Sequence, residues 1–216
     1  MSKIIAKSIL EYWQNYIKNS DPLIKDWLKK ENNYLKENIK KGAVVLDVGC
    51  GFGRNVMVIT NVARKIIGID NNKLLCKKIV KNLSMYKNVE FFCENAQKMY
   101  FSNNVFDYVI CMGNTFGNFG KNKLKILKEM KRVTKKGGKI FVSVYSEKAL
   151  DIRKKEYRRI GIKIKEISNG TIYTNNHLVL EQFDKEKLKK IFNSAKLKVK
   201  IIELNPISYL CKAVNK

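Results

Sequence analysis

The residues best suited to bind a ligand lie in a glycine-rich turn that follows an apolar run. Residues 44–48 (VVLDV) read as a buried strand, and Gly49, Gly51 and Gly53 mark a turn that opens a helix. A second short strand, residues 65–69, ends on Asp70. Glycine lets a ligand approach the backbone where a Cβ would block it. A carboxylate at a strand tip can accept hydrogen bonds from a ribose diol, so the pattern predicts a site for a nucleoside-carrying cofactor.

The spacing of the glycines separates this turn from two common phosphate-binding loops. Dinucleotide-binding turns use G-x-G-x-x-G, but Arg54 stands three residues after Gly51, where that pattern needs its last glycine. The sequence also lacks a G-x-x-x-x-G-K-[ST] loop for a nucleoside triphosphate. The cofactor is therefore expected to be neither a dinucleotide nor a triphosphate.

The segment LDVGCGFG, residues 46–53, resembles the first motif of the class I S-adenosylmethionine (SAM) dependent methyltransferases, and the likeness covers most of the chain. Later landmarks follow in the order of that family: strands at 89–93 and 106–111, then a Lys-Gly-Gly turn and a fifth strand at 136–144. The resemblance implies an α/β fold with a doubly wound, mostly parallel seven-stranded sheet. Its last strand would run antiparallel between the fifth and sixth.

The resemblance also implies SAM as the cofactor and assigns residues to it. Asp70 would bind the ribose, and Asn95 and Ala96 the adenine, although many family members carry an acid before that alanine. Asp47 would shape the glycine turn through backbone hydrogen bonds. The cofactor-binding positions expected in this way are Asp47, Gly49, Cys50, Gly51, Gly53, Asn55, Asp70, Asn71, Asn95, Ala96 and Met112.

Methyl transfer from a sulfonium depends on alignment of the acceptor, and it needs a base only where the acceptor arrives protonated. Asn114 and Thr115 lie where the resemblance presents the methyl group, and they are expected to orient an acceptor amine or hydroxyl. His177, the only histidine, is the candidate proton acceptor if the segment that carries it folds over the site. No metal is expected, because the cysteines form no C-x-x-C pair and do not cluster with His177.

The sequence predicts a single domain, residues 1–216, in which strands and helices alternate from residue 43 to 145. Helices expected over 4–19 and 21–40 would form an N-terminal cap (1–41), with Asp21-Pro22 as the start signal of the second helix. A helix over 184–195 and strands over 198–204 and 208–214 would close the fold.

Residues 146–182 interrupt this alternation between the fifth strand and the last helix. They contain a basic helical segment at 151–159, a hairpin turn at Ser168-Asn169-Gly170, and short strands at 171–174 and 177–180. In small-molecule methyltransferases of this fold, an insertion at this place covers the active site. The resemblance therefore implies that residues 146–182 form a substrate lid, where specificity commonly lies.

The composition bears on partners and location. The chain has 44 Lys and Arg against 19 Asp and Glu, a net charge of +25, which predicts attraction to polyanions. No apolar run approaches the ~20 residues of a membrane span, and the N-terminus lacks a leader pattern, so no membrane contact is expected. Five cysteines, of which Cys50, Cys93 and Cys111 are expected to be buried, fit a reducing cytoplasm.

Absent motifs narrow the acceptor. Enzymes that methylate exocyclic amines of bases carry an Asn/Asp-Pro-Pro-Tyr type motif after the fourth strand, and this sequence has no such motif there. The Pro-Cys pair of cytosine C5 enzymes is also absent from the sequence. Residues 113–119 instead resemble the Gly-Asn-Ser/Thr-aromatic segment of glycine- and sarcosine-type N-methyltransferases. The sequence thus favours a small-molecule acceptor methylated on nitrogen or oxygen. The alternatives are an RNA (cap or tRNA) methyltransferase that uses residues 153–165 and the Lys-rich helices as a phosphate track, and a non-enzymatic binding protein, against which the intact glycines and Asp70 argue.

Overall fold

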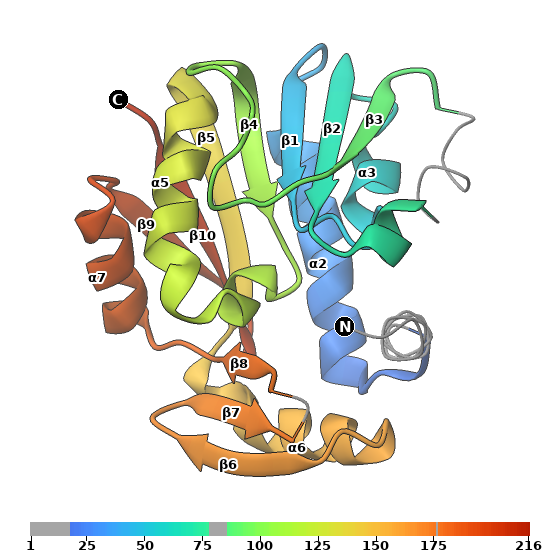
Figure 1. Cartoon of the computed structure of the whole chain (residues 1–216), viewed down its shortest axis with the longest axis vertical. Helices are drawn as coiled ribbons and strands as arrows, with labels where there is room; N and C mark the ends of the chain where they lie inside the picture. Colours follow the sequence, from blue (N-terminus) through green and yellow to red (C-terminus); the bar gives the residue numbers. More distant parts are fainter. Residues whose placement is uncertain (1–17, 78–85, 176) are drawn as a thin grey trace.

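The fold is built around one mostly parallel sheet, seen in the computed structural model, which describes residues 18–77, 86–175 and 177–216. The seven strands lie in the order β3-β2-β1-β4-β5-β10-β9 (Figure 1). The parallel strands are β1 (Val44–Val48), β2 (Lys65–Asp70), β3 (Val89–Cys93), β4 (Phe106–Cys111) and β5 (Thr134–Tyr145). β10 (Ser208–Val214) runs antiparallel between β5 and β9 (Val199–Asn205). This topology confirms the predicted sheet, including the position of its antiparallel strand.

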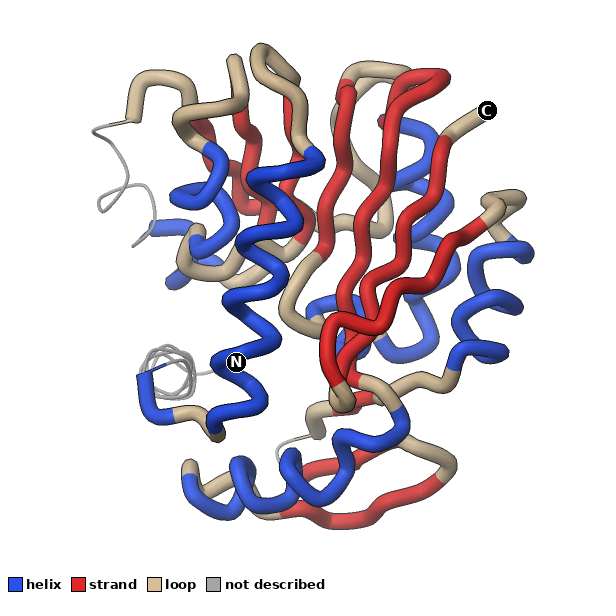
Figure 2. The backbone as a smooth tube through the Cα atoms, turned by 180° about the vertical axis from the view of Figure 1, so that it is seen from behind, coloured by secondary structure: helices blue, strands red, loops and turns tan. Residues whose placement is uncertain are grey.

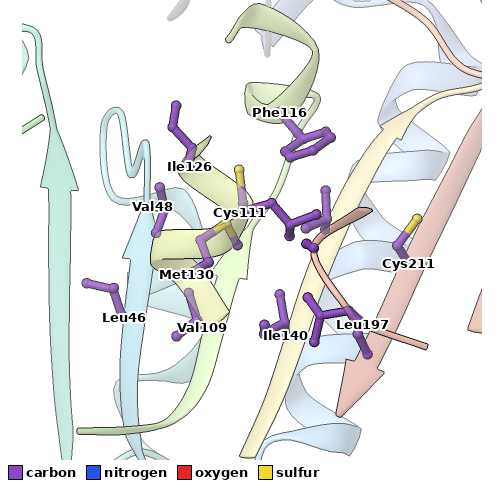
Figure 3. Close-up of a cluster of buried hydrophobic side chains, with 14 of the residues drawn as sticks. Leu46, Val48, Val109, Cys111, Phe116, Ile126, Met130, Ile140, Leu197 and Cys211 are labelled. Atoms are coloured by element: carbon purple, nitrogen blue, oxygen red, sulfur yellow. The ribbon is translucent and has the colours of Figure 1, made fainter. Parts of the chain in front are cut away.

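Helices cover both faces of the sheet. α5 (Lys123–Val133) and α7 (Lys185–Ser194) pack on one face, and α2 (Pro22–Asn38) and α3 (Arg54–Ile59) on the other (Figures 1 and 2). Because both faces are covered, the inner strands are apolar almost throughout, and every residue of β1 is buried. Figure 3 shows how Ile126 and Met130 of α5 pack against Val48 and Val109 of the sheet.

The edge of the sheet differs from its centre, and one sequence prediction fails there. β3 pairs only with β2 in the described part of the chain, and none of its five residues is fully buried. Cys93, expected to be a buried packing residue, is therefore exposed, whereas Cys50 and Cys111 are buried. The prediction for Cys93 is wrong because an apolar strand pattern does not show which strand lies at the edge.

The helix start signals act as expected. Pro22 is the first residue of α2, and the Asp21 carboxylate accepts a hydrogen bond from the Leu23 N–H at 2.9 Å. The Asp184 carboxylate caps α7 by accepting from the Lys187 N–H at 2.6 Å. Of the helix predicted over residues 4–19, positions 18–19 are helical and the others lie outside the described residues, as does the start of the N-terminal cap.

Residues 146–175 and 177–182 form a separate small layer beyond the carboxyl end of β5. It contains α6 (Leu150–Arg159) and a second, antiparallel sheet of β6 (Ile164–Ser168), β7 (Thr171–Thr174) and β8 (Val179–Glu181) (Figure 1). The predicted hairpin turn is present, with Asn169 and Gly170 both at positive φ. β8 begins at Val179 and not at His177, because His177 itself has a φ of +61°. Among the described residues, the 3₁₀ helices η1 (Thr115–Asn118) and η2 (Gly120–Asn122) lie between β4 and α5, and η3 (Glu147–Ala149) lies between β5 and α6.

None of the helices described is both long and apolar enough to cross a lipid bilayer.

Candidate functional site

The glycine-rich turn lies beyond the carboxyl end of β1 and leads into α3. Gly49, Gly51 and Gly53 have φ values of +71°, +56° and +79°, a region that favours glycine. A Cβ on Gly49 would lie 2.2 Å from Cγ2 of Thr115, in the segment that follows β4, whereas a Cβ on Gly51 would have no neighbour within 4 Å. The turn is therefore packed against the β4 segment at Gly49 and open at Gly51.

Asp70 at the tip of β2 faces this turn. One carboxylate oxygen, Oδ2, accepts a hydrogen bond from the Gly51 N–H at 3.0 Å, and the other accepts from the Asn72 N–H at 2.9 Å. Burial raises the pKa of Asp70, and the hydrogen bonds from the Asn72 and Gly51 N–H groups act in the opposite direction. The structure thus brings Asp70 and Gly51 together.

Asp47 and Asn55 lie beneath the turn, both buried. Burial raises the pKa of Asp47 to about 7, although Asn55 Nδ2 donates to its two carboxylate oxygens at 3.4 and 3.3 Å. The Oδ1 atom of Asn55 is buried and has no hydrogen-bond partner within the described residues. A buried acceptor without a donor is unusual in a folded protein, so this atom marks a place where a ligand would supply an N–H group.

The other predicted cofactor residues follow the carboxyl ends of neighbouring strands. Met112 is buried at the end of β4, and Cys50 is buried in the glycine turn. Asn71 is exposed just beyond Asp70. After β3, Asn95 is exposed and its Oδ1 accepts from the Gln97 N–H at 2.9 Å, while Ala96 packs partly against the core. All of these residues lie at one edge of the sheet, but their contacts with a cofactor stay predictions.

The two candidate catalytic residues lie in different surroundings. Asn114 is buried in the segment after β4; its Oδ1 accepts from the Tyr145 N–H at 3.0 Å, and its Nδ2 donates to the Glu181 carbonyl at 3.3 Å. His177 is exposed in the turn between β7 and β8, and its imidazole makes no hydrogen bond to another described residue. The structure does not join these two side chains, and their catalytic roles stay predictions.

The sequence pattern did not reveal a buried ionic network beside the turn. Glu31 of α2 is fully buried, and its Oε2 accepts from Nη2 of Arg54 at 2.6 Å. Its Oε1 accepts from the Gly113 N–H at 3.2 Å and from the Ser143 hydroxyl. One signal could have found this network, because an acid at position 31 interrupts the buried apolar stripe of α2, Ile24, Trp27 and Leu35.

Comparisons with known proteins agree with this geometry. Residues 45–138 match a family model described as a methyltransferase domain. The demethylmenaquinone methyltransferase of Bacillus licheniformis is 34% identical over 123 residues, which are 54% of this chain and 50% of that protein. The chain spans about half the length of the curated relatives it matches.

Two solved structures show the same fold over nearly the whole chain. A SAM-dependent methyltransferase from Aquifex aeolicus has a TM-score of 0.67 at 19% identity, covering 92% of this chain and 96% of that one. The 1,6-didemethyltoxoflavin-N1-methyltransferase of Burkholderia thailandensis, solved with S-adenosylhomocysteine (SAH), has a TM-score of 0.66 at 12% identity, covering 98% and 89%.

The strand order is that of the class I methyltransferase fold, and residues 45–138, which include the glycine turn and Asp70, match a methyltransferase domain. Residues 46–53, which resemble the first motif of the SAM-dependent methyltransferases, lie within the matched segment. The residues present fit SAM: the open backbone at Gly51 admits a ligand, Asp70 offers a carboxylate to a ribose, and the unpaired Asn55 Oδ1 offers an acceptor to an ammonium group.

Proposed function

We propose that this protein transfers the methyl group of SAM to a nitrogen or oxygen atom of a small-molecule acceptor. When bound, SAM supplies an electrophilic methyl carbon. The acceptor lone pair bonds to that carbon in line as the carbon–sulfur bond breaks, and SAH leaves. The acceptor proton goes to water or to a base, for which His177 is the candidate if the β7–β8 turn reaches the acceptor. Asn114 contributes by holding the segment after β4, because both ends of its amide are bonded to the backbone.

The observation that carries the small-molecule proposal is the direct contact between the segment after β4 and residues 146–182. The Asn114 amide bridges the backbone of β5 and the backbone of β8. A Cβ on Gly117 would lie 2.7 Å from the Glu181 carbonyl, so the two segments touch. This closeness supports residues 146–182 as a lid over the methyl-transfer site. Such a lid would enclose the acceptor, which favours a small molecule over a folded nucleic acid.

The basic segment of α6 gives less support to RNA binding than its sequence suggests. Arg153 is fully buried, and its guanidinium carbon lies 4.8 Å from the ring centre of Tyr145. Arg159 pairs with Glu156 at 2.6 Å, and Lys154 pairs with Asp151 at 3.2 Å. Three of the cations in or beside the expected phosphate track are thus engaged within the protein, which weighs against that alternative.

The similar proteins support the same choice. The Bacillus licheniformis relative and the Burkholderia thailandensis structure are both named for the methylation of small molecules, demethylmenaquinone and 1,6-didemethyltoxoflavin. We place the enzyme in the cytoplasm, a proposal that rests on the cysteine usage of the sequence.

The experiment that tests this function is transfer of a radiolabelled methyl group from SAM into total cell extract, followed by separation of small molecules, protein and nucleic acid. We expect label in the small-molecule fraction with the wild-type protein, and at subsaturating SAM at least about tenfold less with the Asp70→Ala variant. NMR of the labelled product then locates the methyl group. Label in RNA would contradict the acceptor class, and a methyl group on carbon would contradict the acceptor atom.

A further inference from the structure

The order of the strands sets the direction in which the cofactor lies. The predicted adenine contacts follow β3, the ribose contact Asp70 follows β2, and the glycine turn follows β1. These strands are adjacent in that order, and β4 comes next. The amino-acid half of the cofactor must therefore lie beyond β1 and β4. Near these strands α2 packs across one face of the sheet (Figure 2), and Glu31 of α2 contacts Arg54 of α3 there.

Arg54, the first residue of α3, places a cation beside the carboxyl ends of β1 and β4. It directly follows Gly53, and its Nη2 lies 3.4 Å from the position that a Cβ on Gly113 would take. Nη1 donates to Asn32 at 2.8 Å and Nη2 donates to Glu31 at 2.6 Å. A guanidinium has five N–H groups, and the side chain is 19% exposed, so N–H groups remain for an incoming carboxylate.

The neighbouring residue supplies the complementary atom. Asn55 is buried, and its Oδ1 has no donor among the described residues. An α-amino acid end carries a carboxylate and an ammonium group on one carbon. Arg54 and Asn55 both stand at the start of α3, where the glycine turn ends, and they offer a guanidinium and an unpaired amide oxygen, the partners that these two groups require.

Glu31 explains why Arg54 has a fixed position. A buried carboxylate is costly unless it is fully bonded, and here Arg54, the Gly113 N–H and the Ser143 hydroxyl all donate to it. Since its oxygens are engaged and its side chain has no exposure, Glu31 is not placed to accept a proton from a substrate. Its contacts link α2, α3 and the segment after β4 around the guanidinium.

We propose that Arg54 binds the carboxylate of the amino-acid half of SAM, with Asn55 Oδ1 accepting from its ammonium group, and that Glu31 is the positioning residue that holds Arg54 for this contact. The inference rests on the proposed function, since it assumes that SAM is the methyl donor. It adds to the predicted site two residues that the motif does not include.

The test compares two ligands that share the adenosine half. SAH has the amino-acid half, whereas 5′-methylthioadenosine lacks it. We expect Arg54→Gln and Glu31→Gln each to weaken SAH binding by about tenfold or more, the size of a charge-assisted hydrogen bond, and to leave 5′-methylthioadenosine binding unchanged in calorimetry. Matched controls are Arg64→Gln and Glu37→Gln, which make the same chemical changes at exposed positions and should alter neither affinity.

A double variant tests the positioning role. If Glu31 acts through Arg54, the Glu31→Gln/Arg54→Gln protein loses no more SAH affinity than Arg54→Gln alone. Equal weakening of both ligands would show a merely structural role and overturn the proposal, as would SAH affinity that stays unchanged in Arg54→Gln. If Glu31→Gln fails to fold, Glu31→Asp, which keeps the charge but shortens the reach, takes its place. Failure of the wild-type protein to bind either ligand would instead overturn the proposed function.

Discussion

Three acidic side chains, Glu31, Asp47 and Asp70, converge on the glycine turn of a protein whose net charge is +25. The charges of Asp70 and Glu31 both act to raise the pKa of Asp47, and that of Arg54 acts to lower it. The sign of charge around the turn is therefore opposite to that of the whole chain. SAM is a cation through its sulfonium group, and SAH is neutral, so such a site favours the methyl donor over the product.

Asp47 makes stability depend on pH in a defined direction. Burial raises the pKa of the Asp47 carboxyl from its ordinary value of 3.8, which applies to the unfolded chain, to about 7 in the folded protein. Between these values the folded protein keeps a proton that the unfolded chain releases, so this group lowers stability as pH rises. We expect Asp47→Asn to gain stability relative to wild type between about pH 5 and about pH 8.

Thermal unfolding of both proteins across that range measures the difference. Asp151→Asn, at an exposed position, is the matched control. A stability difference between Asp47→Asn and wild type that does not change with pH would contradict the buried-carboxylate account.

The glycine turn allows a sharper steric prediction. Gly49 and Gly51 both have positive φ, so an alanine is strained at either position, but only at Gly49 does the new Cβ collide with Cγ2 of Thr115. We expect Gly49→Ala to lower the free energy of unfolding by about 1–3 kcal/mol more than Gly51→Ala. Adding Thr115→Ser removes the methyl group and keeps the hydroxyl, and it should recover most of that difference in urea denaturation. Equal stability of the two alanine variants would contradict the packing at Gly49.

The sequence predicted the pairing of Asp70 with the glycine turn, which follows a local pattern, and missed contacts that depend on tertiary packing. Asp70 and the glycines could be found because strand, turn and acid follow one another along the chain. Glu31 lies 23 positions before Arg54, on a helix that approaches the turn only after it packs on the sheet. Similarly, Arg153 reads as a surface cation, but packing against Tyr145 and Tyr157 buries it.

At the scale of elements, Asn114 connects the sheet to residues 146–182. Its positive φ of +62° turns the chain after β4 and points the amide between β5 and β8. The positions of the strands in the main sheet follow from apolar runs in the sequence, so these strands were predictable to within a few residues. The contact of β8 with this segment was not, since it depends on how the insertion folds back.

We expect Asn114→Asp to loosen that contact selectively. The aspartate keeps an acceptor for the Tyr145 N–H but places an oxygen against the Glu181 carbonyl, at a cost of about 1–3 kcal/mol. Hydrogen exchange should therefore become faster in β7 and β8 and stay slow in β5. Asn104→Asp, at an exposed position that also has positive φ, controls for the substitution itself. Unchanged exchange in β8 would show that Asn114 does not hold the insertion.

In the whole molecule, 44 basic side chains outnumber 19 acidic ones, so the net electrostatic interaction among the charges is repulsive. Salt screens this repulsion, with a Debye length that falls from about 10 Å at 0.1 M to a few ångström at 1 M. We expect the Tm to rise when NaCl increases from about 50 mM to about 500 mM. A Tm that falls over this range would mean that the ion pairs within the fold outweigh the net repulsion.

Equilibrium binding of SAM to the purified protein tests whether the glycine turn and Asp70 form its binding site. A partner carboxylate hydrogen-bonded to a ligand contributes about 1.5–3 kcal/mol, so Asp70→Ala should weaken SAM binding by about 10- to 150-fold. Asp151→Asn serves as the control at an exposed acid. We predict that the wild-type protein binds one SAM per chain saturably and that Asp70→Ala binds it about 10- to 150-fold more weakly. Absence of SAM binding in the wild-type protein, or an unchanged affinity in Asp70→Ala, would show that the glycine turn and Asp70 are not the SAM site.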